Sequence, residues 1–450
     1  MKVLVCVKVS GGEINPFDES ALEWALRISE DVTVLSMGPE NMKEVLKPLT
    51  RLGAKVTLLS DSLFAGSDTL ATAYILSVAA RKLGYDFIIC GKQSIDGDTA
   101  QVGPMLSEFL KCNLITNALE VKASENEVIT VTREGEEKAK LPALVTVERS
   151  AVMRFPSIFS KTCEVQVLNN SHLGCDAAKC GLSGSPTRVL KSFTYEKGRR
   201  HCKFISREEL LPLINTLLAE NKANEEKSEK AEKLRSVWAV GNEVLEKASE
   251  IADEVVFIEK TDAEAIAERA IKEKPDVILW NADNWGRKTA PQVAAMLNTG
   301  LCADCTELEA EDGKLIMYRP AKGGSIYAKI KCLTNPQMAT VRTKQKSGEI
   351  IVSAGKGAAE SLDKVEALAK ELDAEMCASR GLVDMGCAEY ARQVGLTGKT
   401  VSPKVYIAIG ISGAVHHTCA IEGADTVIAI NMDKDARIFE YADYGILEEF

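Results

Sequence analysis

An internal repeat without gaps constrains the fold of this chain more than any other feature. Asp86–Ala100 and Asp276–Ala290 align at a constant offset of 190 residues, and each combines an apolar strand pattern with a turn and a helix start. Further along, Leu141–Val147 resembles Asn335–Val341. We therefore expect two copies of one domain, packed as an intrachain pseudo-dimer in the way that homodimers favour.

Strand and helix patterns alternate within the first copy. Apolar strands are predicted at Lys2–Lys8, Val32–Met37 and Ala54–Leu59, with a helix over Asn41–Leu52 between the last two. Strict alternation of this kind is typical of a parallel, doubly wound sheet. The predicted fold class is α/β, with two duplicated doubly wound domains followed by a third, Rossmann-like domain.

The charge and the cysteines exclude several classes of protein. A net charge of −10 argues against a nucleic-acid partner, because duplex binding needs an excess of Lys and Arg. No apolar run approaches the ~20 residues of a membrane span, and the chain opens on a strand pattern, so we expect a cytoplasmic protein. The thirteen cysteines are irregularly spaced. Only Cys302–Cys305 has C-x-x-C spacing, and it lacks a second ligand pair, so we predict no metal site.

A glycine-rich turn near the C-terminus predicts a ligand site. The apolar strand Val405–Ile409 runs into Gly410–Gly413, a helix is expected from Ala414, and the strand Thr426–Ile430 ends at Asn431. Open α/β sheets bind ligands at the carboxyl ends of their strands, and glycine lets the backbone approach a phosphate. The alternative is a glycine turn without ligand, since isolated glycine motifs are common.

The same domain carries a second glycine loop. Ile350–Ser353 reads as a strand, Ala354–Gly357 as a loop and Ser361–Leu372 as an amphipathic helix. Two glycine-lined helix starts in one domain favour a dinucleotide site.

The strand Phe87–Cys90 of the first copy leads into a further candidate phosphate loop, Gly91–Gly103. Asp96–Thr99 combines a glycine with helix-capping residues, which would leave the amides of Thr99–Val102 free to bind phosphate. The alternative is that an aspartate caps its own helix.

Several motifs resemble the electron transfer flavoproteins. The N-terminal half looks like the β subunit, through Asn15–Asp18, Phe64–Thr72 and Cys90–Pro104. The half from about Leu234 resembles the α subunit; its motifs are Ala303–Thr306, Ala339–Arg342, Gln393–Gly398, Gly410–His417, Ala429–Asn431 and Ala442–Gly445. The chain therefore resembles a fused, single-chain electron transfer flavoprotein, β then α.

The resemblance implies five segments. They are a β-type adenine-nucleotide-binding domain (1–164), an arm with a partner-recognition loop (165–220), a charged linker (221–233), an α-type N-terminal domain (234–345) and an FAD-binding domain (346–450).

The resemblance also implies a set of FAD-binding residues. Hydroxyls of Thr397 and Ser412 would bond the isoalloxazine edge, and a cationic His417 would stabilise an anionic flavin. The full set is Arg342, Gly355, Lys356, Val394, Gly395, Leu396, Thr397, Ser412, Gly413, Ala414, Val415, His416, His417, Asn431 and Asp443. The family usually has arginine at the position of Lys356 and glutamine at those of Leu396 and His416, so contacts near the ring differ.

A second nucleotide, AMP or another FAD, is implied for the β-type domain. Its expected contacts are Cys6, Asn15, Pro16, Phe17, Asp18, Met37, Gly91, Lys92, Gln93, Asp96, Gly97, Asp98, Thr99, Ala100, Gln101 and Val102. In the arm, Leu173 aligns with the leucine that family members insert into a partner dehydrogenase. The alternative is a loop residue packed on its own domain.

Three functions are compatible with these features. The first is a noncatalytic electron carrier serving a flavin dehydrogenase of the acyl-CoA type, as a monomer or weak homo-oligomer. The second is a bifurcating, NADH-oxidising flavoprotein with two FAD, which the segment Gly181–Thr187 and the duplicated nucleotide fold motivate. The third is an adenine-nucleotide-binding regulatory protein whose flavin site has decayed.

Overall fold

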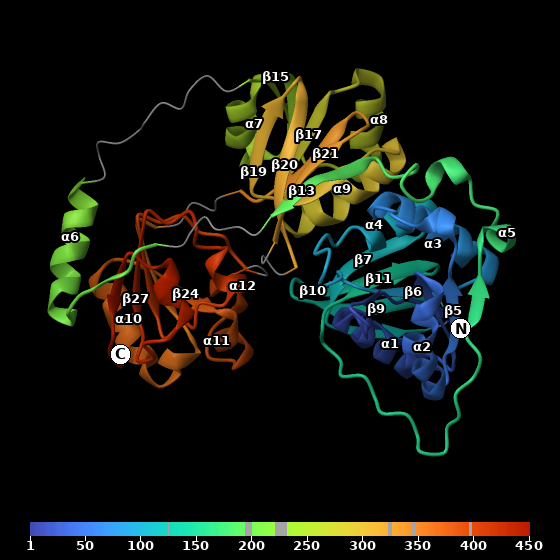
Figure 1. The fold of residues 1–450 in the computed structure, drawn as a ribbon, viewed down its shortest axis with the longest axis horizontal. Coiled ribbons are helices and arrows are strands. Elements are labelled where there is room, and N and C mark those ends of the chain that lie inside the picture. The colour runs from blue at the N-terminus through green and yellow to red at the C-terminus, as the bar shows by residue number, and fades with distance from the viewer. Residues whose placement is uncertain (125, 194–199, 221–231, 323–325, 344–347, 396–397) are drawn as a thin grey trace. The chain divides into compact units, whose positions relative to one another are not determined.

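The computed structural model describes residues 1–124, 126–193, 200–220, 232–322, 326–343, 348–395 and 398–450 (Figure 1). The chain forms two compact units. The first comprises Met1–Ser192, Glu232–Lys322 and Ala328–Val341; the second comprises Phe193–Ala231, Gly323–Tyr327 and Arg342–Phe450.

A parallel sheet forms the centre of the first copy, in the order β12-β5-β4-β1-β6-β11-β7. Its central strands are apolar and almost fully buried, as strands covered on both faces must be. The strands are β1 (Lys2–Cys6), β4 (Asp31–Met37), β5 (Lys55–Leu59), β6 (Phe87–Gly91), β7 (Asn113–Ala118), β11 (Ala143–Val147) and β12 (Gln166–Leu168). The helices are α1 (Pro16–Ile28), α2 (Lys43–Leu46), α3 (Thr69–Leu83) and α4 (Val102–Leu110), and β2 (Val9–Ser10) pairs with β3 (Glu13–Ile14).

The helix predicted over Asn41–Leu52 is wrong in detail. The segment consists of a 3₁₀ turn (Glu40–Met42), the single turn α2 and a second 3₁₀ stretch (Lys47–Leu52). Pro48 has no amide hydrogen, so an α-helical hydrogen bond is lost where α2 ends.

The second copy repeats the strand order of the first, which confirms the predicted duplication. Its sheet runs β16-β15-β17-β22-β18, matching β4-β1-β6-β11-β7. The repeated segments form β6 and β17, and β11 and β22. The elements are β15 (Leu234–Val240), β16 (Ala252–Ile258), β17 (Val277–Asn281), β18 (Leu301–Cys305), β22 (Gln337–Val341), α7 (Leu245–Ile251), α8 (Ala263–Glu273) and α9 (Asn284–Leu297).

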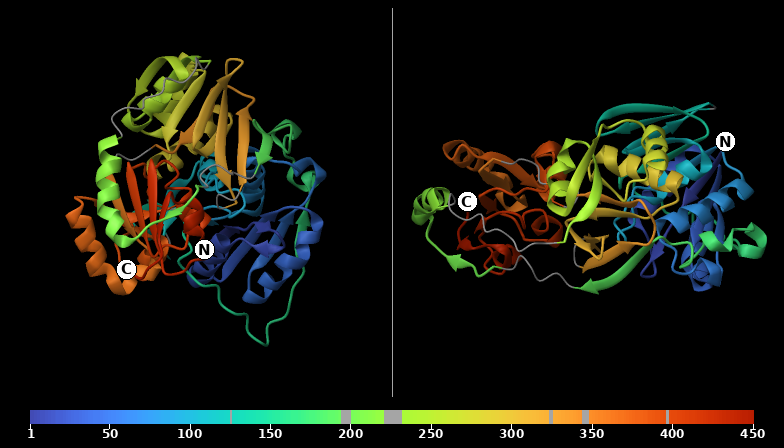
Figure 2. Two further views of the ribbon diagram at one scale, coloured as in Figure 1. Left: turned by 60° about the vertical axis from the view of Figure 1, so that its left-hand side comes forward. Right: turned by 90° about the horizontal axis from the view of Figure 1, so that it is seen from above.

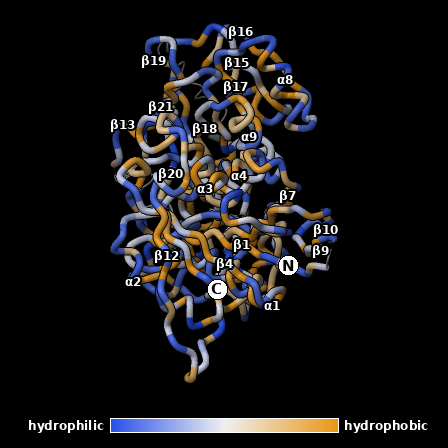
Figure 3. The backbone as a smooth tube through the Cα atoms, turned by 90° about the vertical axis from the view of Figure 1, so that its right-hand side faces the viewer, coloured by the Kyte–Doolittle hydropathy of each residue, from blue (hydrophilic) through white to orange (hydrophobic). Residues whose placement is uncertain are grey.

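The two copies share one apolar core. α4 packs against α9, and one cluster of buried side chains continues from Leu4 and Ile88 of the first sheet to Trp238 and Trp280 of the second. α7 covers the opposite face of the second sheet, where Ala248 and Ile251 pack in one cluster with Val237 and Ala239. Figure 2 shows the chain from two further sides. In Figure 3, β1 and β4 are hydrophobic stretches inside the first copy. The first unit is therefore a pseudo-dimer built on a continuous core.

Short antiparallel sheets were not predicted. The first copy carries β8 (Glu120–Ala123), β9 (Glu127–Thr132) and β10 (Gly135–Lys140). The second carries β19 (Glu307–Glu311), β20 (Lys314–Ala321) and β21 (Ile326–Cys332). The arm adds α5 (Asn170–Leu173) and β13 (Thr187–Phe193), which joins the second of these sheets beside β21.

The second unit contains a parallel sheet in the order β14-β28-β27-β26-β23-β24-β25. Helices α6 and α10 cover one face through Leu210, Ile214 and Val365. The strands are β14 (Lys203–Phe204), β23 (Ile350–Ala354), β24 (Glu375–Ser379), β25 (Gln393–Val394), β26 (Val405–Ile409), β27 (Thr426–Ile430) and β28 (Tyr444–Ile446). The helices are α6 (Leu210–Glu220), α10 (Leu362–Glu371), α11 (Arg380–Asp384) and α12 (Val415–Thr418).

The arm expected at 165–220 divides between the two units. Residues up to Ser192 belong to the first unit, whereas β14 and α6 are part of the second. Residues 221–231 of the expected linker lie outside the described residues.

Candidate functional site

A cavity of about 340 Å³ opens at the carboxyl ends of β1, β4 and β6. Parallel sheets place ligands at this edge. The lining residues are Cys6, Val7, Lys8, Asn15, Asp18, Leu35, Met37, Ser67, Asp68, Thr69, Thr72, Leu76, Cys90, Gly91, Lys92, Gln93, Ser94, Gly97, Thr99, Ala100, Gln101, Val102 and Gly103.

The loop after β6 is held by side chains at the start of α1. The Asn15 amide donates to the Gln93 carbonyl (2.9 Å), and the amide of Gly91 donates to Asp18 Oδ1 (3.1 Å). A β-carbon on Gly91 would lie 2.2 Å from that same oxygen, so only glycine fits. The loop that borders the cavity is therefore fixed in place.

Free backbone amides face the cavity at the start of α4. Asp98 and Ala100 have φ of 51° and 53°, and no side chain caps the helix. Within the described part of the chain, the amides of Thr99 to Gly103 donate no hydrogen bond. Uncapped amides at a helix start bind phosphate.

The alternative, an aspartate that caps this helix, is not what the structure contains. Asp96 pairs with Lys8 (2.8 Å) and accepts from the amide of Gly97, and Asp98 accepts from the Gln93 side chain (3.1 Å). Burial acts to raise the pKa of Asp96, but the hydrogen bond from Lys8 lowers it to about 2.

Asp18 is buried beneath the same loop. Its Oδ2 accepts from the amide of Lys8 (2.8 Å). Burial raises the pKa of Asp18 to about 7, although the amides of Lys8 and Gly91 act in the opposite direction. The carboxyl group therefore changes charge near neutral pH.

The second copy also holds this loop. Arg319 donates to the Asp98 carbonyl (3.1 Å), and the Gln101 side chain donates to the Leu301 carbonyl (3.1 Å). The cavity thus depends on contacts from both copies.

The counterpart position in the second copy is closed by its own side chains. Asp283 caps α9 by accepting from the amide of Gly286 (2.7 Å) and pairs with Lys260 (3.0 Å). The rings of Trp280 and Trp285 pack 5.8 Å apart. The repeated fold therefore keeps its open phosphate loop in the first copy.

Most of the residues predicted for this site line the cavity. Pro16, Phe17, Asp96 and Asp98 do not: the first two begin α1, and the two aspartates make the bonds described above. Sequence reasoning missed the start of α3. The motif Phe64–Thr72 was recognised, but Ser67, Asp68, Thr69 and Thr72 were not assigned to the site.

A second group of loops meets at the carboxyl edge of the sheet in the C-terminal domain. Gly355 follows β23, Gly410 follows β26 and Asn431 follows β27. The amide of Gly357 donates to the Gly410 carbonyl (3.0 Å), and the Asn431 amide donates to the Ile411 carbonyl (2.9 Å). A β-carbon on Gly355 would lie 2.2 Å from the Gly410 oxygen. The glycines thus allow two loops to touch.

The segment that begins with β25 joins this group. A β-carbon on Gly395 would lie 3.0 Å from the His416 carbonyl oxygen, so the segment packs on the α12 backbone. Gly413 is buried, whereas Ser412, Ala414 and His416 are exposed and Val415 is half-buried. Leu396 and Thr397 lie outside the described residues. Lys356 begins the 3₁₀ turn after Gly355.

His417 does not have the predicted positive charge. Its side chain is buried, and its Nε2 lies 2.9 Å from the Tyr406 hydroxyl oxygen. Burial lowers the pKa of His417 to about 4, so the ring is neutral at physiological pH.

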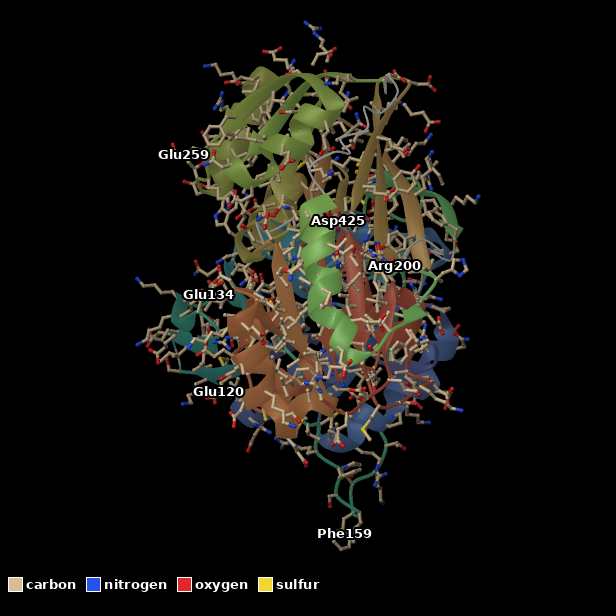
Figure 4. The ribbon with its side chains drawn as sticks, turned by 90° about the vertical axis from the view of Figure 1, so that its left-hand side faces the viewer. Glu120, Glu134, Phe159, Arg200, Glu259 and Asp425 are labelled. Carbon is tan, nitrogen blue, oxygen red and sulfur yellow. The ribbon has the colours of Figure 1, made fainter. Side chains whose placement is uncertain are left out.

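Asp443 lies at the opposite edge of the sheet from these loops. It precedes β28, and its Oδ2 accepts from the amide of Val427 near the start of β27 (2.8 Å). Arg200 pairs with it and donates to the Asp425 carbonyl (3.0 Å); Arg200 and Asp425 are labelled in Figure 4. We therefore correct the assignment of Asp443 to the cofactor site. Arg342 directly follows β22, and its predicted role stays a prediction.

No cluster of three or more potential metal ligands occurs among the described residues. None of the helices described is long and apolar enough to span a membrane.

Comparisons with known proteins cover both halves. Residues 3–173 and 221–367 match the family model of the electron transfer flavoprotein domain, and residues 345–422 match that of the electron transfer flavoprotein FAD-binding domain. The electron transfer flavoprotein subunit beta of Megasphaera elsdenii is 43% identical over 203 residues (40% of this chain, 75% of the relative). Subunit alpha of Thermoanaerobacterium thermosaccharolyticum is 39% identical over 232 residues (41% and 70%). Protein FixB of Clostridium saccharobutylicum is 37% identical over 252 residues (44% and 75%).

Proposed function

The chain belongs to the electron transfer flavoprotein family, and we propose that it carries electrons on FAD from a flavin dehydrogenase of the acyl-CoA type to a downstream acceptor. The observation that carries this proposal is the group of glycine-joined loops at the carboxyl edge of the C-terminal sheet. FAD, when bound there, supplies the redox chemistry.

The residues at that edge fit a dinucleotide. Gly355 and Gly410 bring two loops into contact, and exposed Ser412 offers a hydroxyl beside them. The buried His417 Nδ1 has no hydrogen-bond partner among the described residues. These residues would hold and orient FAD, and the buried core under β26 keeps water from that side of the loops. The decayed-site alternative receives no support from this arrangement.

We assign an adenine mononucleotide, AMP, to the cavity of the first copy. The volume of about 340 Å³ is at the small end for ligand pockets. The uncapped start of α4 would bind its phosphate. Lys92 is paired with Glu148 (2.9 Å), so the phosphate would depend on backbone amides more than on this lysine.

The segment that motivated the bifurcating alternative has a packing role. A β-carbon on Gly181 would lie 2.3 Å from the Leu63 carbonyl oxygen, and one on Gly184 would lie 2.0 Å from the Lys179 carbonyl carbon. Thr187 donates to Asp68 Oδ2 (2.7 Å). The glycines of Gly181–Thr187 therefore allow close backbone contacts, and we do not favour an NADH site in this segment.

Leu173 remains our candidate for partner binding. It ends α5 and is half-buried against the shared core. The remaining exposed part of the side chain is what a dehydrogenase would contact.

The test is reduction of the bound flavin, followed by its absorbance. We expect reduction by an acyl-CoA dehydrogenase with its substrate, and no rapid bleaching by NADH alone. Rapid bleaching by NADH with two FAD per chain would favour the bifurcating alternative. A Leu173→Ala variant should slow reduction by the dehydrogenase while leaving reduction by dithionite unchanged.

A further inference from the structure

Tyr406 and His417 form a buried polar pair in the C-terminal domain. Tyr406 lies on β26 and is fully buried, and its hydroxyl oxygen is 2.9 Å from His417 Nε2. His417 belongs to the predicted FAD site, whereas Tyr406 does not. The other residues of β26 are apolar, and a buried hydroxyl among them needs a hydrogen-bond partner.

The chemistry of the two groups favours the hydroxyl as the donor of this hydrogen bond. Burial raises the pKa of Tyr406 well above its ordinary value and lowers that of His417, so both groups are neutral. A phenol hydroxyl donates readily to a neutral imidazole nitrogen, and a neutral ring has one N–H and one acceptor nitrogen. If Nε2 accepts from Tyr406, the ring proton is on Nδ1.

The other side of the ring faces the segment that begins with β25. The backbone of Val394 partly offsets the effect of burial on the His417 pKa, as a carbonyl that faces a ring N–H does. The next residue, Gly395, packs directly on the backbone of His416. Among the described residues, the Val394 backbone is therefore the group that faces Nδ1, although the pair falls outside the distance and angle limits of a full hydrogen bond.

We propose that Tyr406 is a positioning residue of the FAD site. Its hydroxyl fixes His417 as the neutral Nδ1–H tautomer, and the ring then holds the backbone of Val394 and Gly395 against the turn Gly410–Gly413. This inference rests on the proposed function, because these two segments form the proposed FAD site. The ring contributes orientation and no charge.

The direct test is the tautomer of His417 in the full chain. The sequence has four histidines, so their side-chain nitrogens can be resolved by ¹⁵N NMR with and without FAD. We expect Nδ1–H in the wild type and a shift towards the Nε2–H form in Tyr406→Phe. The matched control, Tyr444→Phe, changes a half-buried tyrosine of the same sheet and should leave His417 unchanged. An Nε2–H ring in the wild type, or an unchanged tautomer in Tyr406→Phe, overturns the proposal.

FAD affinity gives a second readout. Loss of one positioning hydrogen bond should weaken FAD binding by Tyr406→Phe roughly three- to tenfold. If the wild type binds no FAD, the proposed function fails, whereas the tautomer still decides the role of Tyr406 towards His417.

A second pair of variants covers the case in which Tyr406→Phe does not fold. The amide of Asn can take the place of Nδ1–H, so His417→Asn should keep more FAD affinity than His417→Leu. Equal losses in the two variants contradict the proposal.

Discussion

Asp18 is a residue whose charge depends strongly on the fold. Its pKa is raised to about 7 by burial, so the folded protein binds a proton that the unfolded chain has released above about pH 4. Asp18 therefore contributes stability at low pH that is lost as the pH rises towards and through 7.

This predicts a pH-dependent difference between the wild type and Asp18→Asn. From pH 5 to pH 8, the free energy of unfolding of the wild type should fall by about 2 to 3 kcal/mol relative to that of the variant. Urea unfolding at both pH values measures the change. A constant difference between the two proteins would show that Asp18 does not titrate in this range.

Asp443 illustrates where residue-level prediction fails. The motif Ala442–Gly445 was recognised, but a motif does not reveal at which edge of a sheet it lies. Hydrogen bonds from Arg200 and Val427 place the carboxylate at the amino end of β27.

The charge of His417 was likewise mispredicted, because burial and the Tyr406 contact depend on the tertiary fold.

Asp443→Asn should therefore lower stability without releasing FAD. Loss of the pair with Arg200 should cost on the order of 1 kcal/mol, visible as a lower midpoint of thermal unfolding. The flavin spectrum and FAD affinity should be unchanged. Loss of FAD at unchanged stability would restore Asp443 to the cofactor site.

At the scale of elements, strands were easier to predict than helices. The apolar runs at Val405–Ile409 and Thr426–Ile430 form β26 and β27 with the predicted bounds. The helix expected from Ala414 is only the single turn α12. The arm could not be divided in advance, because β13 and β14 pair with strands far away in the sequence.

The contact between Gly355 and Gly410 gives a prediction for the FAD site. Gly355→Ala should separate the two loops, because its β-carbon would lie 2.2 Å from a backbone oxygen. We expect FAD affinity to fall by roughly tenfold or more, measured by fluorescence titration. Gly381→Ala is the control in the same domain, because its β-carbon would meet nothing closer than 3.7 Å. Similar FAD affinities of the two variants would show that the contact between Gly355 and Gly410 does not support FAD binding.

For the whole molecule, the duplication could be predicted from the sequence because two 15-residue segments align without a gap. The packing of the two copies as a pseudo-dimer was predicted as well. The closed second site was not predicted, because it depends on how Trp280, Trp285 and Asp283 pack in three dimensions.

The dependence of the first site on the second copy can be tested at Arg319. Arg319→Ala removes the hydrogen bond to the Asp98 carbonyl and should weaken AMP binding about tenfold, measured by calorimetry. Lys314→Ala, at the exposed start of the same strand, is the control. An unchanged affinity in Arg319→Ala would mean that the loop holds its shape without the second copy.

The nucleotide content of the chain decides most directly whether it is an electron carrier: the purified full chain is denatured, and the released nucleotides are separated by chromatography and counted. We expect one FAD and one AMP per chain. A colourless protein that releases no FAD and cannot be reconstituted with it would contradict the assignment of an electron carrier.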